Sequence, residues 1–168
     1  MNQATVLAYH QLLEMCKAQT LKTCQEVKPE FHLHQLKEGK GHPLWLLGHL
    51  ANTLDVVGNF WTYGEGPVLA KKYGMKFAPD FAGGDPITNN PDDYPSWETL
   101  MEDYASIFDS FLERVKKTSD EELQEAPRGP VPEGMSDFFS SIGNDLRIMV
   151  LHDTHHRGQI SMIAKLDG

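Results

Sequence analysis

The spacing of residues near the C-terminus is the feature that most constrains how this chain can fold. Between Ser136 and Lys165, residues that fit a buried helix face recur three or four positions apart, as on the core-facing side of an α-helix. They are Phe138, Ile142, Met149, His152, His156, Ile160 and Ile163. Because Ser136 is a good N-cap, we expect one helix from there to about Lys165.

Two histidines belong to this series. His152 and His156 are four residues apart, so their rings share one helix face and can reach a single point. A buried imidazole needs a hydrogen-bond partner or a metal ion, and two that converge favour the metal. The H-x-x-x-H pattern alone is a weak signal in a chain with eight histidines, and hydrogen-bonded core histidines are the alternative interpretation.

The same helical periodicity recurs along the chain, and no segment has the pattern of a strand. Residues 64–95 are instead rich in Gly and Pro, which is typical of a connection built from turns. We therefore predict an all-α fold, a four-helix bundle with a long crossover between its second and third helices, forming a single domain over residues 1–168. The other helices are expected at about 4–24, 43–63 and 96–117, with a short one begun by the capping box at 119–122.

Composition excludes several classes of partner. The chain has 24 acidic and 15 basic residues, a net charge of −9, which would repel the phosphates of a nucleic acid. No signal-peptide pattern and no apolar run of about 18 residues is present, so we expect a cytoplasmic protein that does not enter membranes. Cys16 and Cys24 are too few for a disulfide framework, and we assign neither a catalytic role.

Two imidazoles do not complete a metal site, since catalytic sites usually have three protein ligands and an open position. His49 is the best third candidate, because it lies on the apolar stripe of the helix expected at 43–63. Four-helix bundles build such sites from facing helices. Three neutral nitrogens suit a divalent transition metal, zinc or nickel first and iron next.

The remaining histidines are weaker candidates. His155 lies about 100° around the helix from His152 and His156, so we exclude it. His42 precedes His49 by two turns and could line the mouth of a pocket without touching the metal. His10, His32 and His34 have no converging partners, and we expect them at the surface.

Two further polar residues are candidates for catalysis. Asp145 lies two turns before His152 on the same stripe, where it could support a metal ligand, act as a general base or, as we favour, play a structural part. Asn52 lies one turn after His49 and could orient a ligand, contact the substrate or satisfy backbone groups.

Two motifs together resemble a known family. Trp45-Leu46-Leu47-Gly48-His49-Leu50, followed near the C-terminus by His152-x-x-x-His156-Arg157-Gly158-Gln159, is similar to the DinB-like (DinB/YfiT) superfamily of metalloenzymes. The resemblance covers essentially the whole chain. It implies a four-helix bundle with a long crossover, commonly a homodimer, and a divalent metal held by His49, His152 and His156.

The resemblance leaves the reaction open. The superfamily includes metal-dependent transferases that use bacillithiol, mycothiol or glutathione, and a thiol-dependent isomerase. We expect a metal-dependent enzyme acting on a small molecule, either a low-molecular-weight-thiol S-transferase with the thiol as co-substrate or a metal-activated hydrolase. The alternative is a non-catalytic, metal-binding, stress-related dimeric helical bundle.

Two surfaces remain to be explained. Leu44, Leu47 and Leu54 lie opposite His49 on the second helix, so we expect either a second copy of the chain or the long connection to cover them. The connection at 64–95 is either a lid over the metal site or a crossover that packs on the bundle. Its aromatic residues, which could wall a pocket or cap the core, are Tyr73, Phe77, Phe81 and Tyr94.

Overall fold

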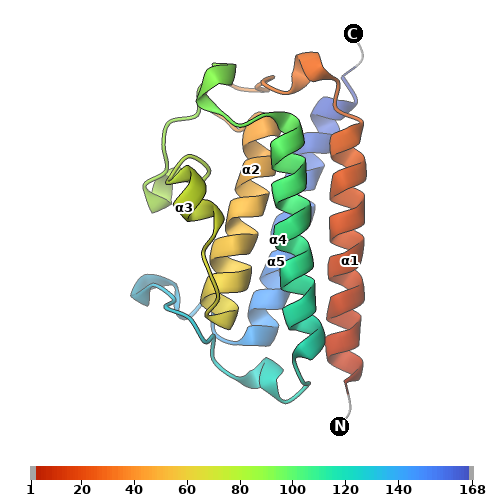
Figure 1. Ribbon diagram of the computed structural model, residues 1–168, viewed down its shortest axis with the longest axis vertical. Coiled ribbons are helices and arrows are strands. Elements are labelled where there is room, and N and C mark those ends of the chain that lie inside the picture. Colours follow the sequence, from red (N-terminus) through yellow and green to blue (C-terminus); the bar gives the residue numbers. More distant parts are fainter. Residues whose placement is uncertain (1–2, 167–168) are drawn as a thin grey trace.

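Four long helices lie side by side in the computed structural model, which describes residues 3–166 (Figure 1). A fifth, α3 (Leu69–Tyr73), lies outside them in the long connection. The expected all-α class is confirmed, since residues 3–166 contain no strand. The long helices are α1 (Ala4–Gln25), α2 (Pro43–Thr53) with its π-helical continuation η2 (Leu54–Trp61), α4 (Trp97–Lys117) and α5 (Ile142–Ala164).

The directions of the helices explain the long connection. Helix α1 packs on α4 and α5, and α2 packs on the same two helices. Figure 1 shows α1 and α5 running in one direction and α2 and α4 in the other. Since α2 and α4 begin at the same end of the molecule, the chain between them must return along the full length of the helices.

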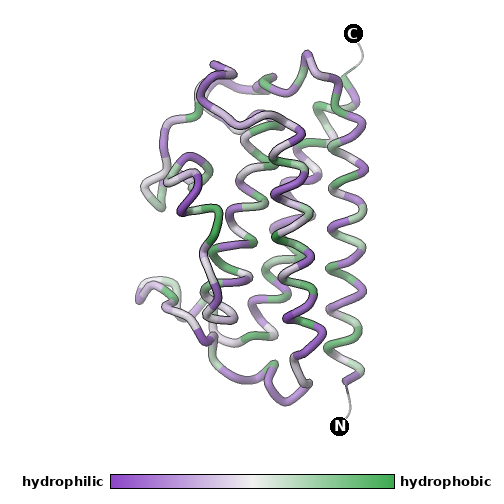
Figure 2. Tube along the Cα trace, in the orientation of Figure 1, coloured by the Kyte–Doolittle hydropathy of each residue, from purple (hydrophilic) through white to green (hydrophobic). Residues whose placement is uncertain are grey.

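Helix α4 shows how the pattern positions the core. Its residues Tyr104, Phe108, Phe111 and Val115 are at most 2% exposed, and they recur at the three- and four-residue spacing expected from the sequence. Burying an aromatic or aliphatic side chain of this size stabilises the fold by roughly 1.5–3 kcal/mol. Figure 2 shows the same succession of hydrophobic and hydrophilic positions along each long helix.

Helix α5 begins later than the sequence predicts. Ser141, rather than Ser136, caps it: the Ser141 hydroxyl accepts a hydrogen bond from the amide of Asn144. Phe138 lies before the helix and is 61% exposed, so its assignment to the buried stripe was wrong. Its neighbour Phe139 enters the core instead and packs edge-on against Trp61, with ring centroids 5.2 Å apart.

The segment between α4 and α5 caps two helix ends. Ser119 and Glu122 form the expected capping box through reciprocal side-chain to amide bonds, but the helix that follows is one 3-10 turn, η5 (Glu122–Gln124). The Asp120 carboxylate accepts hydrogen bonds from the amides of Thr5 and Val6. Helix α1 has no capping side chain of its own, so its cap comes from a distant part of the chain.

Helix α2 is enclosed on every side. All residues from Pro43 to Asn52 are buried, because α4, α5 and the long connection surround the helix. Leu44, Leu47 and Leu54 are accordingly at most 6% exposed within one copy of the chain. The expectation that a second copy covers them was therefore wrong, and the chain itself supplies the cover.

No helix within residues 3–166 is both long and apolar enough to cross a membrane.

Candidate metal centre

Three imidazole rings meet where α2 faces α5. His49 comes from α2, and His152 and His156 come from consecutive turns of α5. Each ring offers one nitrogen, and these atoms all lie within 4.8 Å of one another. The Nε2 atoms of His49 and His152 are 3.1 Å apart. The structure therefore brings together the three residues that the sequence predicts as ligands.

The long connection fixes the ring of His49. Nδ1 of His49 lies 2.8 Å from the carbonyl oxygen of Phe77. A carbonyl can only accept, so Nδ1 carries the proton and Nε2 keeps its lone pair facing the other two rings. Trp45 stacks on His49 with ring centroids 4.8 Å apart, and its indole N–H donates to the carbonyl of Lys76.

Gly48 is what allows the connection to come this close. A Cβ atom at this position would lie 2.3 Å from the ring of Phe77. Phe77 is 1% exposed, so it belongs to the core and not to a mobile cover. Of the four aromatic residues considered for a lid, Phe81 is the most exposed, at 80%.

A residue on the same helix holds His156. Its Nδ1 lies 2.6 Å from the side-chain oxygen of Gln159, three residues further along α5. The amide oxygen accepts, which places the proton on Nδ1 and leaves Nε2 with a lone pair. Two of the three rings thus have a hydrogen-bond partner on Nδ1, and metal-ligating histidines usually have such a partner on the nitrogen that does not bind the metal.

Burial keeps the three rings neutral. It lowers the pKa of His49 to about 4 and, with the neighbouring imidazoles adding to the effect, that of His152 to about 2. Burial also lowers the pKa of His156. The neutral form is the one that binds metal ions, so the cluster needs no deprotonation at neutral pH before it can hold an ion.

The other histidines lie outside the cluster. His155 is exposed, with its ring centroid 4.9 Å from that of His156. His42 is fully buried and does not line a pocket mouth: it caps α2 by accepting from the amide of Trp45, and Nε2 donates to the carbonyl of Thr88. His32 is half-buried and stacks on Trp97, so its expected place on the open surface was wrong.

Asp145 lies away from the cluster. It precedes His152 by two turns, roughly 10 Å along the helix, and is fully buried. Its Oδ2 is 2.9 Å from the Thr62 hydroxyl, which is also 2.8 Å from the carbonyl of Val57. The Thr62 hydroxyl can donate to only one of these acceptors at a time, and Oδ1 of Asp145 has no hydrogen-bond partner within the described residues. Burial raises its pKa to about 6, and these contacts favour the structural role.

Asn52 lies nearer than Asp145 to the candidate metal ligands, one turn beyond His49. It is 8% exposed, and its amide makes no hydrogen bond within the part of the chain that the structure describes.

Sequence reasoning missed one buried carboxylate beside the cluster. Asp153 follows His152 directly and is 4% exposed. It accepts hydrogen bonds from Tyr104 and Thr20. It points away from the histidine stripe, so the periodicity of that stripe did not identify it, although acidic residues are rarely buried without a partner.

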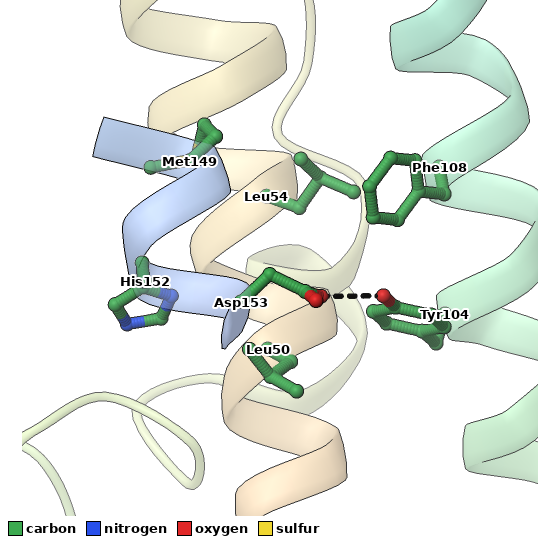
Figure 3. Close-up of a pocket in the computed structure, with 7 residues that line it drawn as sticks. All are labelled: Leu50, Leu54, Tyr104, Phe108, Met149, His152 and Asp153. Carbon is green, nitrogen blue, oxygen red and sulfur yellow. Dashed lines mark hydrogen bonds between the residues drawn. The ribbon is translucent and has the colours of Figure 1, made fainter. Parts of the chain in front are cut away.

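A small cavity lies on the core side of His152 (Figure 3). Its lining is mainly apolar, and its size admits about one water molecule. His152 and His156 are themselves partly exposed, so a ligand can reach them without entering this cavity. The lining residues are Leu50, Leu54, Tyr104, Phe108, Met149, His152 and Asp153.

One comparison with known proteins gives a match. The DinB superfamily model matches residues 12–160, a segment that contains the three histidines, all of α2, most of α5 and the whole connection. The searches of curated proteins and of solved structures find no match.

We predict that Gly48→Ala lowers stability by roughly 1–3 kcal/mol, because the buried ring of Phe77 must move. The same movement shifts the carbonyl that holds His49, so zinc affinity should also fall, by about tenfold. Thermal unfolding and calorimetric titration with zinc measure the two effects.

Gly158→Ala is the matched control. It replaces another helical glycine, but one whose Cβ would have no neighbour within 4 Å, and it should stabilise α5 slightly. An unchanged melting temperature in Gly48→Ala would contradict the close approach of Phe77.

A second prediction concerns pH. The folded-state pKa of Asp145, about 6, lies above its ordinary value of 3.8, so its protonated form stabilises the fold at low pH and this contribution is lost as the pH rises through 6. Asp145→Asn should therefore gain stability relative to the wild type between pH 4.5 and 7.5, by on the order of 2–3 kcal/mol. Urea unfolding of both proteins across this range gives the difference in their free energies of unfolding. A difference that does not change with pH would contradict the raised pKa of Asp145.

Proposed function

The chain belongs to the DinB superfamily, and on this basis we propose that it is a divalent-metal-dependent enzyme with His49, His152 and His156 as ligands. The observation that carries the proposal is the convergence of three neutral imidazole nitrogens within 4.8 Å. Two of these rings hold their protons on Nδ1, against Phe77 and Gln159.

The donor set fits such an ion. Two nitrogens bound to one tetrahedral zinc at about 2.0–2.1 Å lie roughly 3.3 Å apart, and those of His49 and His152 are 3.1 Å apart. Imidazole suits zinc, nickel and iron, and we propose zinc or nickel first. Three protein ligands leave coordination positions open, which is typical of a catalytic site.

A divalent ion held here would supply a Lewis acid that lowers the pKa of an incoming thiol or water. The residues of the chain prepare the site for it. Phe77 and Gln159 fix the direction of two imidazoles, Trp45 covers one face of His49, and Asn52 offers an unpaired amide one turn away.

Neither cysteine of the chain provides a nucleophile at the metal. It has two cysteines, both buried. Burial raises the pKa of Cys24 to about 12 and also raises that of Cys16, so both are protonated thiols at neutral pH. This supports a nucleophile that comes from outside, as in a low-molecular-weight-thiol S-transferase, with metal-activated hydrolysis next. The substrate in either case is an electrophilic small molecule.

We propose the four-helix-bundle topology with its long crossover as the frame of this site, and a homodimer as its assembly. Leu151 and Met162 lie three turns apart on the outer face of α5 and are 70% and 63% exposed. Apolar side chains of this size on one helix face favour contact with a second copy.

The dimer predicts a mass of twice the chain by light scattering at micromolar concentration. Leu151→Glu should shift the protein to monomers, because it places a charge in the contact. Leu36→Glu changes another exposed leucine, outside α5, and should leave the mass unchanged. A wild-type monomer would count against the assembly.

For the metal site, we predict that His49→Ala, His152→Ala and His156→Ala each lose most of the bound metal. His155→Ala should retain it, because that ring lies outside the cluster. Elemental analysis of protein purified without a nickel column measures the content and identifies the metal. Full retention in any of the first three variants would remove that residue from the ligand set.

The reaction is tested on the metal-loaded protein. Bacillithiol, mycothiol and glutathione are each supplied with a reactive electrophile, and thiol consumption is followed with and without a chelator. Chelator-sensitive conjugation identifies the transferase, and chelator-sensitive electrophile loss without thiol identifies the hydrolase. Metal binding with neither reaction would favour the non-catalytic, stress-related bundle.

A further inference from the structure

One buried carboxylate, beside the three candidate metal ligands, connects three helices. Asp153 of α5 accepts hydrogen bonds from the hydroxyl of Tyr104 on α4, at 2.6 Å, and from that of Thr20 on α1, at 2.7 Å. Figure 3 shows the first of these bonds beside His152. Tyr104 and Thr20 are at most 1% exposed, so water does not compete for the carboxylate.

The rotation of α5 about its axis matters for the cluster. Side-chain atoms of a helix lie about 5–6 Å from its axis, so a rotation of 20° would displace the imidazole nitrogens by roughly 2 Å. Metal sites tolerate errors of only about 0.2 Å in ligand distance. Some interaction must therefore hold α5 at one rotation about its axis.

Apolar packing near His152 is incomplete. Leu50, Leu54 and Met149 line a small cavity that leaves space on the core side of the ring. Apolar contacts have no preferred direction, whereas the two hydrogen bonds of Asp153 do. The two donors also lie on different helices, so each bond opposes a different displacement of α5.

We propose that Asp153 is a positioning residue for the metal site: held by Tyr104 and Thr20, it fixes the rotation of α5 at which His152 and His156 face His49. This rests on the proposed metal site and assigns the ligand geometry to a residue outside the cluster. Asp153 touches neither metal nor substrate, so its effect passes through the backbone of α5.

Zinc titration of the metal-free protein by calorimetry tests this. Asp153→Ala removes both bonds and should weaken zinc binding at least tenfold. Tyr104→Phe and Thr20→Val remove one hydroxyl each from helices that carry no ligand, and should weaken it severalfold. These two variants also serve if Asp153→Ala does not fold.

Asp153→Asn separates position from charge. Its amide can accept from one hydroxyl and donate to the other, so the geometry is kept while the charge is lost. It should bind zinc within about threefold of the wild type. The cobalt-loaded forms give a second measurement: the visible absorption bands should change in Asp153→Ala and not in Asp153→Asn.

Val115→Ala controls for lost stability alone. Val115 is fully buried on α4, about 16 Å along the helix from Tyr104. The variant should unfold at a lower temperature and bind zinc as the wild type does. A loss of affinity comparable to that of Asp153→Ala would overturn the proposal.

The remaining outcomes are distinct. If the wild type does not bind zinc, nickel or iron, the proposed function fails, and this inference fails with it. If the wild type binds and Asp153→Ala binds equally well, only the positioning role is overturned. If Asp153→Asn is as weak as Asp153→Ala, the carboxylate acts by its charge, and positioning is again overturned.

Discussion

The hydrogen bond between His49 and the carbonyl of Phe77 joins the two parts of the molecule on which the site depends. One part is α2, enclosed by the core, and the other is the long connection that returns along the helices. The bond forms only if Gly48 lets the ring of Phe77 come close. The direction of a candidate ligand is therefore set by the packing of a segment that lies outside the four long helices.

Other buried polar groups attach the same connection to α2. The Asp55 carboxylate, 1% exposed, accepts from the amide of Leu69 at the start of α3. His42 donates to Thr88 further along. Each group would be costly to bury without its partner. The connection is thus held at three places along α2 and its continuation η2, which makes it a structural cover over most of its length.

Much of this could be predicted from local pattern. The three histidines followed from residues at helical spacing, since burial and facing direction repeat with the turn of the helix. The stripe of α4 and the capping box at Ser119 followed for the same reason. Each of these signals depends on residues within a few positions of one another.

The rest depends on partners that are distant in sequence. Asp120 caps α1 across more than a hundred residues. The partner of His49 is a backbone carbonyl, and because every residue has one, the sequence gives no sign of it. Asp153 was missed because its donors, Tyr104 and Thr20, come from two other helices. The late start of α5 has a similar cause, because the contact of Phe139 with Trp61 outweighs the capping preference of Ser136.

The supports of the three rings come from different parts of the fold. The connection holds His49, α5 itself holds His156 through Gln159, and α1 and α4 act on α5 through Asp153. The three nitrogens can therefore meet only when the connection and all four long helices have assembled. An ion that needs all three would bind the assembled chain and not the unfolded one, so its binding free energy would add to the stability of the fold. The site and the fold then stabilise each other, although the ligands occupy only two helices.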